Sequence, residues 1–199
     1  MSHDCCSIRI FTQELRLTIE TIDKTVFKVR LVQDAQINIS PESQLPQDLV
    51  IKPLTKDPDA EYMDRMETLV YKRLSHLQGR HIPRYYGIGD FRYEGKTVKA
   101  HVLERVNGSP LTEIDKADWN KLDIEHKITE AYTELSKQGL IHADVEARHI
   151  FFIDEAQPLM LIDFGLAEFC DCEDAKAQNT NDVEGLMRDL DERQHWARL

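Results

Sequence analysis

The chain has 199 residues, 41% of them hydrophobic, which is enough for one domain or a compact two-lobed one. Its 25 basic and 36 acidic residues give a formal net charge of −11, and such a surface repels phosphate backbones, so nucleic-acid binding is not expected. No apolar run is long enough to cross a bilayer, and residues 1–7 lack the apolar core of a signal peptide. We therefore expect an intracellular protein, cytoplasmic or nuclear, that is neither secreted nor bound to a membrane.

The chain contains four cysteines, Cys5, Cys6, Cys170 and Cys172. Without a secretory signal they are expected to be free thiols in a reducing compartment. A zinc site that combines them with His3 is the alternative, but the spacing is poor for one.

The first part of the chain has the pattern of an antiparallel sheet. Residues 8–12, 15–20 and 25–32 alternate apolar and polar side chains and are rich in β-branched types, so they predict three strands. A turn-like segment over residues 38–46 follows, and Leu49–Lys52 predicts a fourth strand. Lys52 then lies at a strand end, where by itself it would be a surface lysine with its stem on an apolar wall.

A helix is predicted to begin at Pro58. Apolar residues recur at helical spacing and form a stripe: Met63, Met66, Val70, Leu74 and Leu77. Glu67 lies on this stripe, and a carboxylate on a buried face needs a cation, for which Lys52 is the candidate. The alternative is a Glu67 at the edge of the stripe that reaches solvent. Gly79 is expected to end the helix.

Further elements follow in order. Residues 84–91 and 97–106 predict two strands joined at Glu94-Gly95. Residues 122–138 predict an amphipathic helix closed by Gly139, and the residues from Asn179 to Asp182 offer N-caps for one last helix.

The stretch from Ile141 to Glu168 lies between these last two helices. Asp144 and Asp163 each lie beside a short apolar run, residues 150–153 and 159–162, and a turn-like segment separates the runs. This pattern predicts a hairpin that holds two carboxylates near one another, which suits a divalent cation and a hydroxyl to be deprotonated. The alternative is an ordinary hairpin with solvated acids at its ends.

Two motifs in this stretch resemble those of protein kinases. His142-Ala143-Asp144, with His149 five residues beyond the aspartate, resembles the catalytic loop H-R-D-x-x-x-x-N, and Asp163-Phe164-Gly165 resembles D-F-G. The L-V-I-K that ends at Lys52 resembles the kinase V-A-I-K. The size is similar to that of compact atypical kinases: RIO kinases, kinases of tRNA-modification complexes and short fungal kinase-like proteins. Aminoglycoside phosphotransferases share the H-x-D and D-x-G pattern.

The resemblance implies an α+β, bilobal fold in a single domain over residues 1–199. Residues 8–106 would form an N-terminal lobe of antiparallel sheet and one helix, and residues 107–199 a reduced helical lobe. The reduction follows because the chain has no A-P-E motif and little sequence after Glu168.

The resemblance also implies phosphoryl transfer from ATP to a protein or a small-molecule acceptor. Asp144 would be the base, Asp163 would hold Mg²⁺ or Mn²⁺ and contact ATP, and Lys52, fixed by Glu67, would hold the α- and β-phosphates. Leu103 would be the gatekeeper beside the nucleotide, and the carbonyl of Glu104 with the carbonyl and amide of Val106 would face the adenine. The remaining motif residues, His142, Phe164 and Gly165, would be structural.

The chain departs from the kinase pattern at three places. The absent glycine-rich loop and His149, together with the truncated helical lobe, favour a rival hypothesis, a pseudokinase that binds a nucleotide or a partner without turnover, while Ala143 argues against control by activation-loop phosphorylation. The earliest glycine is Gly79, so the glycine-rich phosphate loop is absent. Ala143 replaces the arginine of H-R-D. His149 replaces the metal-binding asparagine, and imidazole is a softer ligand, which predicts a preference for Mn²⁺ over Mg²⁺. Alternatively, His149 only hydrogen-bonds the loop.

Overall fold

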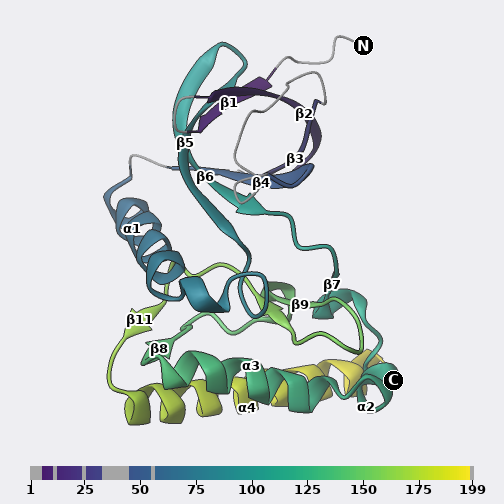
Figure 1. Ribbon diagram of the computed structural model, residues 1–199. Coiled ribbons are helices and arrows are strands. Elements are labelled where there is room, and N and C mark those ends of the chain that lie inside the picture. Colours follow the sequence, from purple (N-terminus) through teal and green to yellow (C-terminus); the bar gives the residue numbers. More distant parts are fainter. Residues whose placement is uncertain (1–5, 11–12, 24–25, 33–44, 55–56, 198–199) are drawn as a thin grey trace. The chain divides into compact units, whose positions relative to one another are not determined.

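A closed barrel of antiparallel strands forms the first of two units into which the chain divides (Figure 1). The computed structural model describes residues 6–10, 13–23, 26–32, 45–54 and 57–197. The first unit comprises residues 1–64 and 84–105, and the second comprises residues 65–83 and 106–199. Strands dominate the first unit and helices the second, so the α+β class predicted from the sequence is confirmed.

The barrel strands follow the order β1-β2-β3-β4-β6-β5, and β5 pairs back onto β1 to close the ring. Their bounds are β1 Cys6–Ile10, β2 Gln13–Asp23, β3 Val26–Leu31, β4 Asp48–Pro53, β5 Tyr85–Tyr93 and β6 Lys96–Glu104. The expected strands are thus present with shifted ends, while Phe11, Thr12, Thr25 and most of the turn-like segment, residues 38–44, lie outside the described residues.

The barrel interior is filled by the alternating apolar side chains of its strands. Fully buried examples are Ile8 on β1, Val29 on β3, Ile51 on β4 and Val102 on β6. Gly89 on β5 allows the close approach of β1, because a Cβ there would lie 2.8 Å from the carbonyl oxygen of Arg9. The sequence alternation therefore has a packing explanation along each of these strands.

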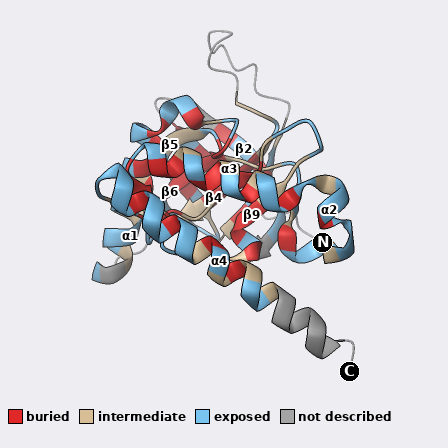
Figure 2. Cartoon of the chain, turned by 90° about the horizontal axis from the view of Figure 1, so that it is seen from below, coloured by how far each residue is buried: buried red, intermediate tan, exposed pale blue. Residues whose placement is uncertain are grey.

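Helices and short sheets make up the second unit. Its elements are α2 Trp119–Leu122, α3 Ile124–Lys137, α4 Cys172–Ala197, the strands β7 Ser109–Pro110, β8 Leu140–Ile141, β9 Ile150–Phe152, β10 Met160–Leu161 and β11 Glu168–Phe169, and most of α1, which spans Pro58–Arg73. Along α3 and α4, buried and exposed residues alternate as expected for amphipathic helices (Figure 2). The end of α3 contacts the start of α4, where the hydroxyl of Ser136 donates to the carbonyl oxygen of Ala175.

Three helix ends differ from the sequence prediction. Helix α3 begins at Ile124 and not at Leu122, because Asp123, with a φ of 53°, separates it from α2. Helix α1 ends at Arg73, and a 3₁₀ turn over Ser75–Leu77 precedes Gly79, which has a φ of 75°. Helix α4 begins at Cys172, well before Asn179, because the side chain of Asp171 accepts the backbone N–H groups of Glu173 and Asp174.

Among the described residues, the buried Cys6 and the exposed Cys170 and Cys172 form no disulfide, while Cys5 and His3 lie outside them. Within the described part of the chain, no helix is both long and apolar enough for a membrane span.

Candidate metal and phosphotransfer site

A short hairpin brings the two motif aspartates to one place. Strands β9 and β10 pair antiparallel, with Leu161 opposite Ile150. Their connection is a turn closed by Asp154, whose side chain accepts the backbone N–H groups of Ala156 at 2.8 Å and Gln157 at 2.9 Å. The loop that carries Asp144 enters β9, and Asp163 follows β10 after one residue, so both lie at the same end of the hairpin.

Asp144, His149 and Asp163 converge at this end. Each offers one ligand atom, and these atoms all lie within 4.8 Å of one another. Nδ1 of His149 is 3.4 Å from Oδ2 of Asp144, and Nε2 is 3.7 Å from Oδ2 of Asp163. The imidazole is buried, whereas both carboxylates are partly exposed. Oxygen and nitrogen donors in this arrangement fit a divalent cation such as Mg²⁺ or Mn²⁺.

The hydrogen bonds of His149 indicate which ring nitrogen carries the proton. Nδ1 lies 3.1 Å from the backbone carbonyl oxygen of Asp144, which can only accept, so Nδ1–H donates. Nε2 then accepts from Nε of Arg148 at 3.0 Å. The lone pair that faces Asp163 is therefore shared with Arg148. Because the side chain of Arg148 is 56% exposed, it can leave without breaking a packed core.

The backbone is unusual at Asp163 and at Ala143, the residue just before Asp144. Ala143 has a φ of 60° and Asp163 a φ of 66°, in the left-handed region that residues other than glycine seldom occupy. Such strain, of order 1–3 kcal/mol per residue, persists only where the surroundings enforce it, and it clusters at functional sites.

Hydrogen bonds made by helix α4 and by His142 hold this strained backbone in place. The buried ring of His142 donates from Nε2 to the carbonyl oxygen of Ile162 at 3.1 Å, the residue just before Asp163. The backbone N–H of His142 donates to Oδ1 of Asn179 at 3.1 Å. Asn179 in turn donates to the carbonyl oxygen of Leu140 at 2.8 Å and to the hydroxyl of Ser136 at 3.0 Å.

Asn179 is the site residue that sequence reasoning missed. It is 1% exposed in the interior of α4. The available signal was its spacing, four residues from Ala175 and four from Val183, which places a polar amide on the buried face of the helix.

The remaining D-F-G residues are packed. Phe164 is fully buried, with ring centroids 5.8 Å from Tyr71 on α1 and 4.9 Å from His142. Gly165 is also buried. Phe164 thus links the segment at Asp163 to the apolar core of the second unit.

The electrostatic environment shifts the titration of two site residues. The pKa of Asp144 is raised, first by burial and then by the neighbouring charges of Glu146 and Asp163, while His149 and Arg148 oppose the shift. Burial lowers the pKa of His142 to about 4, so this ring is neutral. A partly desolvated Asp144 is a stronger proton acceptor than a fully solvated carboxylate.

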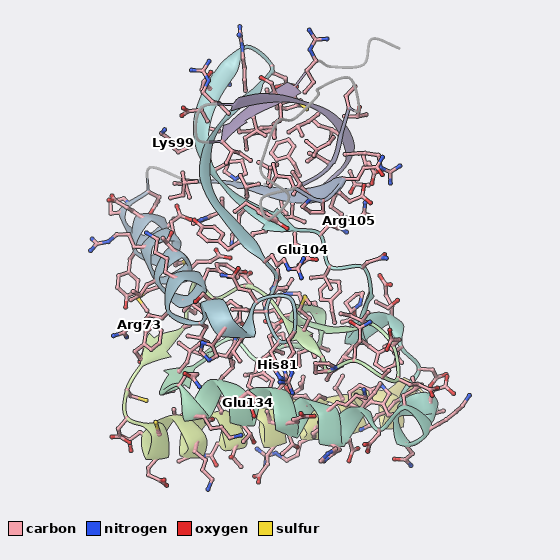
Figure 3. All side chains as sticks on the ribbon, viewed as in Figure 1. Arg73, His81, Lys99, Glu104, Arg105 and Glu134 are labelled. Atoms are coloured by element: carbon pink, nitrogen blue, oxygen red, sulfur yellow. The ribbon has the colours of Figure 1, made fainter. Side chains whose placement is uncertain are left out.

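The other predicted site residues belong to different surroundings. Lys52 lies on β4 opposite His101 on β6, and His101 is buried with its Nε2 3.6 Å from Asp64. Leu103 is buried on β6, and Glu104, labelled in Figure 3, accepts the N–H of Arg84 at 3.1 Å. All these residues lie in the first unit.

Glu67 and Val106 belong to the second unit, where Glu67 is 2% exposed on α1. Asp144, His149 and Asp163, with His142 beside them, all lie in the second unit.

A comparison with protein families matches residues 90–189 to the ABC1 atypical kinase-like domain. The matched segment contains the two motifs, the hairpin between them and most of α4. A comparison with curated proteins gives no match.

Proposed function

Since the chain belongs to the ABC1 atypical kinase-like family, we propose that it is an ATP-dependent phosphotransferase that acts on a hydroxyl group. The observation that carries this proposal is the convergence of Asp144, His149 and Asp163 within 4.8 Å at the end of one hairpin. The acceptor is a protein serine or threonine, or a small molecule. The two units would act as the two lobes of a reduced kinase, in the manner of the compact RIO, tRNA-modification and short fungal kinase-like proteins.

Asp144 is the proposed base. Its raised pKa and its place on a strained, braced loop suit a carboxylate that accepts the proton of the acceptor hydroxyl. His142 and Asn179 hold the backbone on either side of it, so they are positioning residues. Asp163 and His149 would hold Mg²⁺ or Mn²⁺. When bound, such an ion neutralises phosphate charge in phosphoryl transfer.

Lys52 and Glu67 are proposed to act together on the phosphates of ATP. Supporting this, Lys52 lies opposite His101, which approaches Asp64 on α1, and Glu67 follows Asp64 by three residues on the same helical face. A buried carboxylate such as Glu67 also needs a cationic partner. Leu103 is proposed as the gatekeeper, and backbone groups of Glu104 and Val106 are proposed to face the adenine.

The test is transfer of the γ-phosphate from ATP, measured separately with Mg²⁺ and Mn²⁺ against an Asp144→Asn control. We expect transfer in the wild type that the variant lacks. Equal transfer by both proteins would remove Asp144 from the reaction.

A second candidate function is a nucleotide- or partner-binding module without turnover. The observation that favours it is the hydrogen bond from Arg148 to Nε2 of His149, which occupies the lone pair that a metal ion would need. If the chain is such a module, nucleotide should bind with or without metal, and no phosphate should be transferred in the presence of Mg²⁺ or Mn²⁺.

A further inference from the structure

A fully buried histidine lies on the outside of the barrel. His101 on β6 is 0% exposed, while its neighbours Ala100 and Val102 belong to the core inside the ring. Because side chains alternate along a strand, His101 lies on the outer face. The same alternation after Ile51 places Lys52 of β4 on that face, and the register sets Lys52 directly opposite His101. Side chains of directly opposed residues on one face are neighbours, so the imidazole lies beside the stem of Lys52.

Two further elements meet this imidazole, one at each ring nitrogen. Nδ1 lies 3.1 Å from the hydroxyl of Tyr85 on β5, and Nε2 lies 3.6 Å from Oδ1 of Asp64 on α1. A carboxylate only accepts hydrogen bonds, so Nε2 carries the proton and Nδ1 accepts from the tyrosine hydroxyl. All these residues and Lys52 belong to the first unit, which includes the beginning of α1 up to Asp64. His101 therefore connects β5 to the beginning of α1 next to Lys52.

The N–H group at Nε2 restricts where Asp64 can lie. Among the described residues it has no hydrogen-bond partner, and the separation of 3.6 Å from Asp64 is slightly longer than a hydrogen bond. Buried N–H groups are seldom left unpaired, so this one favours positions of α1 in which the carboxylate of Asp64 remains beside it. The imidazole thus acts on the helix as well as on the strand.

The ring beside Lys52 is uncharged at neutral pH. Burial lowers the pKa of His101 to about 4, while the charge of Asp64 opposes this shift and the charge of Lys52 adds to it. The influence of Lys52 means that its ammonium group is within electrostatic reach of the ring. A neutral imidazole adds no second positive charge there. It leaves the carboxylate of Asp64 as the charge that attracts the ammonium group.

We propose that His101 is a positioning residue for Lys52 and that it acts through Asp64. Held by Tyr85, the ring fixes the carboxylate of Asp64 at the outer face of β4, and this carboxylate holds the ammonium group of Lys52 in the place that the phosphates of ATP require. The four-carbon stem of a lysine is flexible, so its charge needs such a constraint to stay in one place. This inference rests on the proposed role of Lys52 in binding ATP.

The binding of adenosine and of a non-hydrolysable ATP analogue separates positioning from packing. Adenosine lacks the phosphates, so the ratio of its dissociation constant to that of the analogue measures the phosphate contacts. By calorimetry, His101→Leu should reduce this ratio about tenfold, and Asp64→Asn should also reduce it. His81→Leu is the matched control, because it makes the same exchange at a second fully buried histidine, in the second unit, and should leave the ratio unchanged. An unchanged ratio in a folded His101→Leu would overturn the proposal.

A double-mutant cycle tests whether His101 acts through Lys52. When Lys52→Ala is already present, His101→Leu should weaken binding of the analogue by less than about twofold, because the ammonium group that it positions is gone. An equal effect with and without Lys52 would assign His101 to the fold alone.

Milder variants serve where His101→Leu does not fold, which urea denaturation shows. Tyr85→Phe removes only the hydroxyl at Nδ1 and should reduce the ratio about threefold. His101→Gln keeps one donor and one acceptor, so its ratio should lie closer to the wild-type value than that of Tyr85→Phe or Asp64→Asn. If Tyr85→Phe and Asp64→Asn both fold and keep the wild-type ratio, the proposal is wrong.

This proposal and the phosphotransferase proposal fail in different ways. If the ratio depends on His101 only when Lys52 is present, but no phosphate leaves ATP, His101 stands as a positioning residue and the phosphotransferase falls. If phosphate is transferred in an Asp144-dependent way, but the ratio is unchanged in Lys52→Ala and in His101→Leu, the phosphotransferase stands and the positioning role falls.

Discussion

The side-chain oxygen of Asn179 accepts the backbone N–H of His142 at 3.1 Å, across a separation of 37 residues. Helix α4 thereby fixes the backbone just before Ala143 and Asp144, the first of which has a φ of 60°. The loop that carries the proposed base is therefore held by a helix that follows both kinase-like motifs in the sequence.

Asn179→Ala should loosen this loop. Loss of a buried acceptor leaves the N–H of His142 unpaired, which lowers the free energy of unfolding by about 1–3 kcal/mol. Turnover should fall by more than nucleotide affinity, because the base and not the phosphate contacts is displaced. Denaturation and kinetics on Asn179→Ala and on the exposed neighbour control Thr180→Ala measure both effects, and equal loss of turnover in the two variants would contradict the assigned role.

Asp144→Asn should abolish transfer while leaving nucleotide affinity nearly intact. Removal of a positioned base reduces the rate by roughly 10²-fold or more. Calorimetric titration with an ATP analogue, alongside the transfer assay, separates the two quantities. A parallel loss of affinity would mean that Asp144 acts on the nucleotide and not on the acceptor.

Lys52→Ala should weaken nucleotide binding and turnover together, because it removes a positive charge from the phosphates. Glu67→Gln should have the same direction of effect if the two residues act as a pair. Lys28→Ala, an exposed lysine on the neighbouring strand β3, is the control. If Lys52→Ala and Lys28→Ala bind the ATP analogue alike, Lys52 is an ordinary surface lysine.

Arg148→Ala should strengthen metal binding, because it frees Nε2 of His149. One hydrogen bond corresponds to about a threefold to tenfold change in the dissociation constant for Mn²⁺. His149→Asn should move the metal preference towards Mg²⁺. Titration of Mn²⁺ followed by electron paramagnetic resonance measures both variants, with Arg188→Ala as control. Identical titrations in all four proteins would remove His149 from the metal site.

The free energy of unfolding should depend on pH because His142 is buried with a lowered pKa. Its pKa is lowered to about 4 in the folded chain from the ordinary value of 6.5, so the unfolded chain binds more protons between these values. Its contribution to stability is therefore fully present above pH 6.5 and is lost as the pH falls towards 4. The total is of order 3 kcal/mol. Urea denaturation from pH 7 to 4 should show this loss, and His142→Gln should flatten the curve.

The sequence predicted the elements better than their ends. Alternation along residues 15–20 and helical spacing around Val70 correctly indicated a strand and a helix, because one face of each is buried. The predicted start of α4 was wrong. Asp171 caps the first turn of this helix, and that turn has too few apolar residues to show helical periodicity in the sequence. The early end of α1 was missed for a similar reason, since Gly79 was taken as the cap without a sign of the intervening 3₁₀ turn.

The residues of the site likewise divide into those that the sequence predicted and those that it did not. Asp144, His149 and Asp163 were found because a hairpin forces the residues at its open end together. The role of Asn179 was not found, because its approach to the loop depends on how α4 packs against α3. No local spacing encodes that packing.

The closed ring of β1 to β6 has a consequence for aggregation and partner binding. Over the residues that the structure describes, each of these strands has a neighbour on both sides, so the ring presents no free strand edge to another chain. A peptide that docks by adding a strand must therefore use a shorter sheet, such as the pair of β8 and β11. Such a peptide would bind next to the backbone of β8, from which the loop with His142 and Asp144 continues. Its binding would therefore affect the conformation of that loop before any other part of the site.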